Sequence, residues 1–556
     1  MMLTRILLVG IIASLAASVL LPLILLFRKA FEDQDGRFAG ITHFIQYFST
    51  PALSESIFNT LFVSFTTTLI SVSLAFLFAY AMKRTMIKGK TFFQQVALLP
   101  LFAPTMMHGI ALTYLFGNQG MVTTGLFGLL PSGFTIELYG PIGIIMAEVI
   151  YTFPQAYLIL AVSFMMADYN LYEAAKVLGA SRLRTFLTVT IPNVKYGLIS
   201  ALFVCFTLSF TDFGAPKVVG GQFNVLATDI YKQVIGQQNM TMGAVVGLLL
   251  TIPAILAFIV DRLIERKQSS TITAKSKPYQ ITPSRGRDLF YFVFCSGISL
   301  AILFLIGSVL FAALVKVWPY DLTLTLNHFD FSQVAGDGTE PLVNSILVAL
   351  ITAVIGTVVT FVSAYLIEKM NVMKGMRQIA YFLSILPLAL PGLVIGLSYV
   401  FFFNKPGNPL NILYGTIWIL VLANIVHFFS VSFITATSAL KRLDKEVEMV
   451  SQSLGVPLYK TFFRVTVPMS LPAILEIAVY YFINSMVTIS AVVFLYAPDL
   501  KLASVAIVNM DDAGDIAPAA AMSILIVAIN LTVRGLFELS TRVVRKRLEV
   551  WQKPST

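Results

Sequence analysis

Residues 168–192 read DYNLYEAAKVLGASRLRTFLTVTIP, and residues 444–468 read DKEVEMVSQSLGVPLYKTFFRVTVP. The two stretches align without a gap at an offset of 276 residues. The eight identical positions are Asp168/Asp444, Leu178/Leu454, Gly179/Gly455, Thr185/Thr461, Phe186/Phe462, Val189/Val465, Thr190/Thr466 and Pro192/Pro468. Because similarity at a fixed offset is typical of an internal repeat, the chain is predicted to contain two copies of one structural unit.

The repeat extends well beyond these stretches. The further matching pairs are Leu99-Pro100/Leu386-Pro387, Pro104/Pro391 and Gly109/Gly396 at an offset of 287, and Asn59/Asn344 and Tyr80/Tyr365 at an offset of 285. We therefore predict a first half over residues 1–264, a basic linker over 265–288 and a second half over 289–556.

The composition indicates an integral membrane protein. Of 556 residues, 57% are hydrophobic and only 12% are charged, whereas soluble chains carry roughly 25% charged residues. Apolar stretches long enough to cross a bilayer predict spans near 6–27, 57–82, 94–116, 141–165, 195–216, 241–261, 290–316, 343–367, 379–403, 415–438, 471–495 and 519–541. The predicted fold class is an all-α membrane protein with about twelve transmembrane helices in two six-helix halves.

The basic residues predict the orientation of these helices. Of 38 lysine and arginine residues, 29 lie on the segments that share a side with the N-terminus. By the positive-inside rule, both termini and the linker are expected in the cytoplasm, and the membrane is expected to be the bacterial inner membrane. The net charge of +10 is therefore explained without a nucleic-acid partner. Since each half has an even number of spans, the halves form a parallel repeat about an axis along the membrane normal.

The segment 168–192 is expected to form a bent pair of short helices at the cytoplasmic surface. Glu173, Ala174 and Ala175 favour a first helix, Gly179 permits a break in the backbone or a close approach, and a second short helix is expected to start over residues 182–187, before Pro192. Such a segment could dock in a groove of a cytoplasmic protein. Alternatively, it could lie on lipid headgroups, or the duplication could simply enlarge the bundle.

The pattern Glu173-Ala174-Ala175, Gly179 and Ile191-Pro192 resembles the EAA loop in the membrane subunits of binding-protein-dependent ABC importers. This resemblance implies a type I importer permease fold and a loop that couples to a separate ATPase. It also implies two copies of a cytoplasmic ABC ATPase and a periplasmic substrate-binding protein as partners. ATP would be used by the ATPase, and no cofactor would be bound by this chain.

The second copy of the loop departs from the pattern of that family. Met449, Val450 and Ser451 stand where Glu-Ala-Ala is expected, while Gly455 and Pro468 remain. One residue earlier, Glu448 could reach the same partner or could be a solvated surface residue. Coupling through the second loop is therefore expected to be weaker or differently charged.

Fused permeases of this length resemble the branch that serves ferric iron, thiamine and phosphonates. Within it, residues 211–250 look most similar to permeases for 2-aminoethylphosphonate, which makes that compound the expected solute and ferric iron and thiamine the alternatives. An ion-coupled secondary transporter is the alternative class. No catalytic cluster is visible, because the four histidines are scattered and Gly89-Lys90-Thr91 lacks the first glycine of a phosphate-binding loop. Neither enzymatic activity nor a metal site is expected.

Polar residues inside the predicted spans are candidates for the translocation pathway, because such residues are costly in a bilayer. These candidates are Glu148, Asp212, Asn424, Asn484 and Thr488. Glu148 pairs with Asn424 and Asp212 with Thr488 at the 276 offset. Each could instead satisfy hydrogen bonds between helices. Five prolines, at 100, 104, 154, 387 and 391, could kink or unwind helices beside the pathway.

Overall fold

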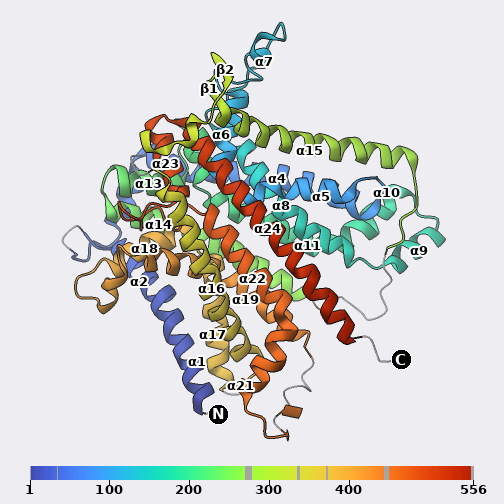
Figure 1. Ribbon diagram of the computed structural model, residues 1–556, viewed down its shortest axis with the longest axis vertical. Coiled ribbons are helices and arrows are strands. Elements are labelled where there is room, and N and C mark those ends of the chain that lie inside the picture. The colour runs from blue at the N-terminus through green and yellow to red at the C-terminus, as the bar shows by residue number, and fades with distance from the viewer. Residues whose placement is uncertain are drawn as a thin grey trace.

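The computed structural model describes residues 2–33, 36–268, 279–334, 338–370, 373–443, 450–451 and 453–552, and these residues are mainly helical (Figure 1). Elements of the first half are α1 (Met2–Leu15), η1 (Ala16–Leu20), α2 (Leu21–Lys29), α3 (Thr42–Ser49), α4 (Pro51–Arg84), α5 (Lys90–Leu98), η2 (Leu99–Phe102), α6 (Thr105–Phe116), α7 (Gly125–Gly128), α8 (Pro141–Met165), α9 (Tyr169–Val177), α10 (Arg182–Thr185), η3 (Phe186–Thr190), α11 (Ile191–Thr211), α12 (Gly214–Val219), α13 (Leu226–Tyr231), η4 (Lys232–Gly236) and α14 (Met240–Gln268).

The second half repeats this order. Its elements are α15 (Arg285–Leu314), β1 (Val315–Val317), β2 (Asp321–Leu324), η5 (Asn327–Phe329), η6 (Phe331–Gln333), α16 (Glu340–Glu368), α17 (Lys374–Ile385), η7 (Leu386–Ala389), α18 (Gly392–Phe403), η8 (Pro409–Leu413), α19 (Ile417–Lys441), α21 (Leu458–Thr461), η9 (Phe462–Thr466), α22 (Val467–Val487), α23 (Ala503–Ala513) and α24 (Ile516–Gln552). Strands β1 and β2 pair antiparallel, with Val315 opposite Leu324, and lie beside α7 at one end of the molecule.

The described residues contain ten helices that are long and apolar enough to cross a membrane, or twelve if each of two bent pairs counts as one span. All twelve predicted spans have a counterpart. The fifth and eleventh spans begin earlier in the chain than predicted. Their helices begin at Arg182 and Tyr459, where the predictions begin at 195 and 471, and the eleventh ends at Val487 instead of 495. The error arose because residues 488–495 are apolar and largely buried without being helical, so hydropathy alone did not separate them from the helix.

The third and ninth spans are bent pairs instead of single helices. In the first pair, α5 with η2 meets α6 at a bend of 105°, and in the second, α17 with η7 meets α18 at a bend of 113°. Each bend falls on the residue before a proline: Ala103 and Leu390 have extended backbones, with ψ of 143° and 126°. A proline disfavours the helical region for the residue that precedes it. Pro104 and Pro391 therefore break these spans, whereas Pro154 lies inside the continuous helix α8.

Both copies of the repeated loop contain a π-helical turn. In the first copy the N–H of Ile191 bonds to the carbonyl of Phe186, and in the second the N–H of Val467 bonds to the carbonyl of Phe462. A wider turn accommodates the proline that follows, whose ring would clash with a carbonyl in a regular helix. The second helix begins at Arg182, as predicted, but it is not short, because the chain stays helical from Arg182 to Thr211.

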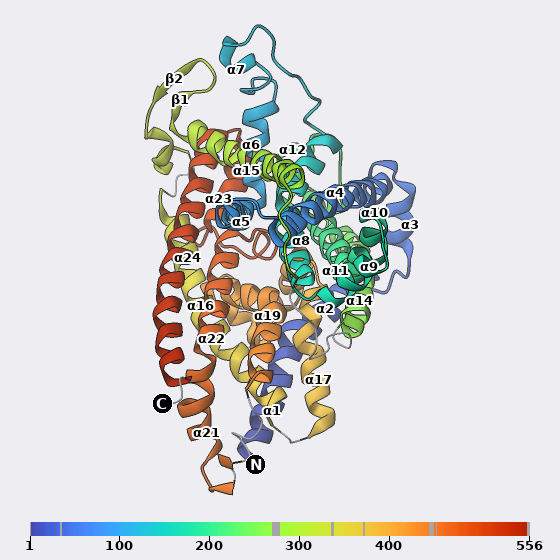
Figure 2. The same cartoon turned by 90° about the vertical axis from the view of Figure 1, so that its right-hand side faces the viewer.

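The helix bundles of the two halves diverge from one end of the molecule. In Figure 1, α4, α8 and α11 run towards the right, whereas α16, α22 and α24 run towards the bottom, and Figure 2 shows the same separation after a quarter turn. The first helix of each half is exchanged: α1 and α2 pack on α16, α17 and α18, and α15 packs on α4, α5 and α6. The halves are thus interlocked.

Asn59 and its counterpart Asn344 form the same kind of hydrogen bond in the two halves. Asn59 Nδ2 donates to the carbonyl of Asn224 at 3.0 Å, and Asn344 Nδ2 donates to the carbonyl of Lys501 at 3.3 Å. The neighbouring hydroxyls, on Thr60 and Ser345, accept the first N–H groups of α13 and α23 at 2.9 and 2.7 Å. Free N–H groups at a helix start need such acceptors. The second span therefore caps a buried short helix in each half.

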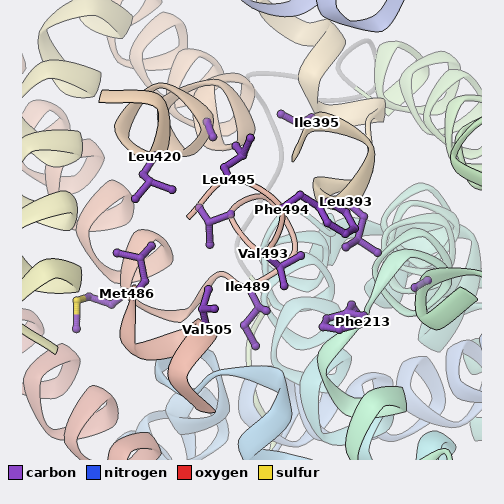
Figure 3. Packing of buried hydrophobic residues seen from close by; sticks show 14 of the residues in the cluster. Phe213, Leu393, Ile395, Leu420, Met486, Ile489, Val493, Phe494, Leu495 and Val505 are labelled. Carbon is purple, nitrogen blue, oxygen red and sulfur yellow. The ribbon is translucent and has the colours of Figure 1, made fainter. Parts of the chain in front are cut away.

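At the end where the bundles meet, the halves share one apolar core. Phe213 of the first half belongs to the same cluster as Leu393, Ile489 and Phe494 of the second (Figure 3). The ring of Tyr231 also stacks on that of Phe494, with centroids 6.5 Å apart. This end is consequently closed by direct packing between the halves.

Candidate translocation cavity and coupling loops

A cavity of about 640 Å³ lies between the halves, next to the shared core. The first half contributes the bend between η2 and α6, part of α8 and the segment that follows α11. The second half contributes α19, α22 and α24. Asp212, Asn484 and Thr488, three of the predicted pathway residues, line it. The unwound turn near Pro104 also lines it, through Phe102, Ala103 and Thr105.

The other two predicted pathway residues lie outside the lining of this cavity. Glu148 and Asn424, at equivalent places in α8 and α19, are both fully buried. Both polar atoms of the Asn424 side chain lack a hydrogen-bond partner in the described structure. The carboxyl group of Glu148 interacts directly with the carboxyl group of Asp212. Glu148 therefore stands behind Asp212, one layer away from the cavity.

Asp212 occupies the turn between α11 and α12. Its Oδ2 accepts the N–H of Ala215 at 3.0 Å, and its side chain also hydrogen-bonds to Thr105 on the bent pair. These bonds hold one carboxylate at the cavity wall in a fixed orientation. Two tyrosines, Tyr151 of α8 and Tyr480 of α22, line the cavity as well. The wall therefore presents carboxylate, phenol and amide oxygens.

A three-residue ion network lines the side of the cavity towards α24. Arg534 Nη1 lies 3.1 Å from Glu476 Oε1, and Arg534 Nε lies 3.5 Å from Glu538 Oε1. Together with Asp212, the lining carries three carboxylates and one guanidinium. Because Arg534 is shared between two glutamates, the cavity has an excess of negative charge.

Sequence reasoning missed Glu476, Glu538, Tyr151 and Tyr480. A usable signal existed, because Glu476, Arg534 and Glu538 are ionisable residues inside apolar spans, and such residues tend to pair. Glu476 and Arg534 lie on different helices 58 residues apart. Their pairing depends on the packing of α22 against α24, which hydropathy does not reveal.

The loop between the fourth and fifth spans of the first half, residues 168–192, projects from the far end of its bundle (Figure 1). Asp168 caps α9 by accepting the N–H of Asn170 at 3.1 Å, and Gly179 has a positive φ of 69° that ends it. Glu173 and Ala174 are exposed and Ala175 is buried. Pro192 is exposed on the helix that follows.

Apolar side chains are exposed on both loops. Val177 and Leu178 are 86% and 83% exposed, and Leu454, the identical partner of Leu178, is 73% exposed. Gly455, like Gly179, has a positive φ, of 65°, and Pro468 is exposed at the same place as Pro192. Glu448 and Met449 lie outside the described residues. Each loop thus presents a leucine beside a sharp turn, at the end of its bundle.

The first loop is attached to the rest of the protein by an aromatic cluster around Arg84. The guanidinium lies 3.8 Å from the ring centroid of Tyr279 and 5.6 Å from that of Tyr172, and it donates to the carbonyl of Phe164 at 3.0 Å. The ring of Tyr279 also contacts Tyr172 and Tyr169 edge to face, at 4.9 and 5.3 Å. Because Tyr279 belongs to the segment that joins the halves, this segment holds α9 against the end of α4.

Among the described residues, no group of three or more histidine, cysteine, aspartate or glutamate side chains is arranged to hold a metal ion. Cys205 and Cys295 are both free and buried.

The family model described as "Binding-protein-dependent transport system inner membrane component" matches this chain twice, over residues 68–270 and 370–546. The two matches confirm the predicted duplication. The first match begins within α4 and the second between α16 and α17, and each extends through most or all of the last helix of its half.

Two relatives are similar over nearly the full chain, and a third is similar over less than half of it. The ferric transport system permease protein of Actinobacillus pleuropneumoniae is 29% identical over 87% of this chain and 70% of its own length. A putative ferric transport system permease protein of Haemophilus influenzae is 28% identical over 88% and 79%. A putative 2-aminoethylphosphonate transport system permease protein of Salmonella typhimurium is 26% identical over 42% of this chain and 90% of its own length.

Proposed function

Because this chain belongs to the family of binding-protein-dependent transport system inner membrane components, we propose that it is the fused permease of an ABC importer for ferric iron. Family membership favours an importer permease, a transport subunit and not an enzyme, over an ion-coupled carrier. The chain is an inner-membrane protein, and the relatives imply a binding protein and an ATPase as partners. The solute, the number of ATPase copies and the orientation are parts of the proposal.

The charge of the cavity carries the choice of solute. Three carboxylates and one guanidinium line it, and two tyrosines add phenol oxygens. Hard cations prefer such oxygen ligands, whereas the phosphonate group of 2-aminoethylphosphonate would need several basic partners and the described lining offers one guanidinium. The expectation of 2-aminoethylphosphonate, which rested on residues 211–250, thus becomes the second candidate. It is supported by relatives that match only about half of the chain. None of the relatives described above is named as a thiamine permease.

In this proposal, loaded binding protein docks on the outer face and releases the cation into the cavity beside Asp212, Asn484 and Thr488. Glu148 and Asn424 stabilise the wall from behind. Two copies of an ABC ATPase, one on each loop, bind and hydrolyse ATP, so this chain binds no cofactor of its own. Both termini face the cytoplasm with the loops, as the basic residues suggest.

The exposed leucines support the docking part of the proposal. Leu178 and Leu454 lie outside the spans and would be unfavourable in water, but they suit the groove of a partner. Glu173, Ala174, Ala175, Gly179 and Pro192 would form the first docking site, and Glu448, Gly455 and Pro468 the second. Closure of the two ATPases would then draw the ends of the two bundles together.

The test is transport by the whole complex in proteoliposomes. Permease, ATPase and binding protein are reconstituted, and uptake of radiolabelled ferric iron and of 2-aminoethylphosphonate is measured with ATP inside. We expect ATP-dependent uptake of iron and none of the phosphonate. Uptake of the phosphonate alone would overturn the choice of solute, and uptake along an ion gradient without the ATPase would overturn the mechanism. Asp212→Asn should reduce iron uptake, whereas Asp330→Asn, at an exposed site in a different part of the chain, is the matched control.

A further inference from the structure

A second cleft, of about 940 Å³, opens between the halves, and none of its described lining residues lines the translocation cavity. The end of α14 from the first half forms one wall, and the end of α16, the start of α17 and the end of α19 from the second half form the other. The end of α19 leads directly into the second loop, and the end of α14 leads into the linker. By connectivity, the cleft therefore lies on the same side of the membrane as the loops.

The polar part of this cleft is strongly basic. Four of its lining residues are Arg262, Lys374, Arg377 and Lys441, and among the described residues Glu368 is its one carboxylate. Lys441 lies 3.9 Å from Glu368, so this single acid partly offsets one of the four basic charges. Arg377 donates to the carbonyls of Ile367 and Glu368 at the end of α16 and keeps its charge. The described lining therefore carries more basic than acidic side chains.

The rest of the cleft is apolar and open to the surrounding membrane. Phe258 and Ile259 line one side, and Tyr381 and Phe382 the other. Ile259 is 46% exposed and Phe382 61% exposed on helices that cross the membrane. The site therefore combines a basic end with an apolar wall that acyl chains can contact.

Comparison with the equivalent seam of the other half shows that the basic charge is particular to this cleft. The equivalent seam is the one that forms the translocation cavity, where α24 stands in the place of α14, and η2 and α8 stand in the places of η7 and α19. Equivalent residues line both sites, for example Leu99 and Leu386, and Leu158 and Ile434. Arg262 corresponds at the 276 offset to Glu538, which lines the acidic translocation cavity. Two seams with the same helical framework thus carry opposite charge.

We propose that the basic cleft binds an anionic phospholipid, with the headgroup phosphate beside Lys374, Lys441 and Arg262 and the acyl chains along the apolar wall. Basic pockets between transmembrane helices at the cytoplasmic surface suit anionic headgroups, and long basic side chains reach towards the interface there. Because the lipid contacts both halves, its binding would also bridge α14 to α17 and α19. The inference does not depend on which solute is transported.

The test measures lipid binding by the full-length permease. Purified protein in detergent is titrated with phosphatidylglycerol or with phosphatidylcholine, and bound lipid is counted by native mass spectrometry. We expect phosphatidylglycerol to bind specifically, and the double variant Lys374→Gln/Lys441→Gln to bind it roughly 30-fold more weakly, because each basic residue near an anionic lipid adds to the attraction. The charge-preserving Lys374→Arg/Lys441→Arg should bind as the natural chain does.

Lys88→Gln is the control for a general loss of surface charge. Lys88 is exposed just before α5, at nearly the same place in the first half as Lys374 in the second. Equal binding of phosphatidylcholine, or unchanged phosphatidylglycerol binding by the double variant, would contradict the proposal. Competition by inorganic phosphate alone would also overturn it, since that would indicate a site for a free anion. Protein stability, followed by thermal melting without lipid, identifies a variant that has merely lost its fold.

Discussion

Two glycines, Gly214 and Gly392, lie at equivalent contacts in the two halves, but on opposite partners of that contact. A Cβ on Gly214 would lie 2.1 Å from Thr105 Oγ1, and a Cβ on Gly392 would lie 2.1 Å from Ser490 Oγ. Gly214 is equivalent to Ser490, and Thr105 to Gly392. In each half, one partner of the contact between the bent pair and the segment after the fifth span bears a hydroxyl, and the other must be glycine.

This exchange predicts a rescue between two substitutions. Gly214→Ser alone forces a side chain into the space of Thr105, so we expect a loss of about 1–3 kcal/mol of stability from overpacking. Adding Thr105→Gly reproduces the arrangement of the second half, and most of the loss should be recovered. Thermal melting of the purified permease measures both. A double variant less stable than Gly214→Ser would contradict the equivalence.

Asp229 predicts a pH dependence of stability. Burial raises the pKa of its carboxyl to about 6, although a hydrogen bond to Ser56 and the charge of Lys232 act in the opposite direction. Since its pKa is near 3.9 in the unfolded chain, the folded state binds more protons between these values, and stability falls as pH rises through that window. A difference of about two between the folded and unfolded pKa values corresponds to about 3 kcal/mol of folding free energy.

Asp229→Asn should therefore raise the melting temperature above about pH 6 and leave it almost unchanged near pH 4, where the natural carboxyl is already neutral. Melting curves across this range measure the difference. Asp330→Asn, whose carboxyl is exposed and whose pKa is lowered by Ser332, is the control and should not stabilise at high pH. Equal stabilisation by Asp229→Asn at both ends of the range would contradict the assignment.

At the scale of elements, the segment that joins the halves has a role that its composition did not suggest. Its residue Tyr279 lies between Arg84, at the end of α4, and Tyr172 and Tyr169, on α9. Cation–π and edge-to-face contacts of this kind contribute about 0.5–2 kcal/mol each. The equivalent of Arg84, Lys369, instead donates to the carbonyl of Leu443 at 3.0 Å. The first loop is therefore held by an aromatic residue from the linker.

We expect Tyr279→Ala to loosen α9 and to lower the ATP hydrolysis stimulated by loaded binding protein about fivefold, from the loss of roughly 1 kcal/mol of contact energy. Tyr279→Phe preserves the ring and should retain the stimulation. The comparison is made in reconstituted complexes with equal amounts of inserted permease. If Tyr279→Ala were as active as the natural chain, Tyr279 would be shown to have no part in positioning the loop.

The loops and bends were largely predictable from sequence, and the side-chain partners were not. Prolines 104 and 391 act on the residue just before them, and the identities near Phe186 and Pro192 mark a local π-turn. Such effects operate within one turn of helix, so a short motif contains them. The pairing of Arg534 with Glu476, and the exchange of α1–α2 with α15, depend on which helices pack together. Apolar helix surfaces alone do not specify that choice.

At the scale of the whole molecule, contacts between the halves close one end, which is the outer end in the proposed orientation, while the loops lie far apart at the other (Figure 1). Besides the shared core, Lys217 of α12 forms an ion pair with Asp512 of α23, with Nζ and Oδ1 2.5 Å apart. The pair joins the two halves directly. In the proposed cycle, the ATPases draw the loops together, and these outer contacts must then separate to admit the cation.

The ion pair between Lys217 and Asp512 should therefore favour the state in which this end of the molecule is closed. Lys217→Met removes a partly exposed pair worth about 0.2–1 kcal/mol, so the equilibrium should shift up to about fivefold towards the state with separated outer ends. The expected readout is a similar rise in ATP hydrolysis without binding protein, because that state is the one in which the ATPases are closed. Lys316→Met breaks a pair with Asp321 inside the β1–β2 hairpin and should change nothing. A Lys217 variant with natural basal hydrolysis would mean that apolar packing around Phe213 and Phe494 closes the outer end by itself.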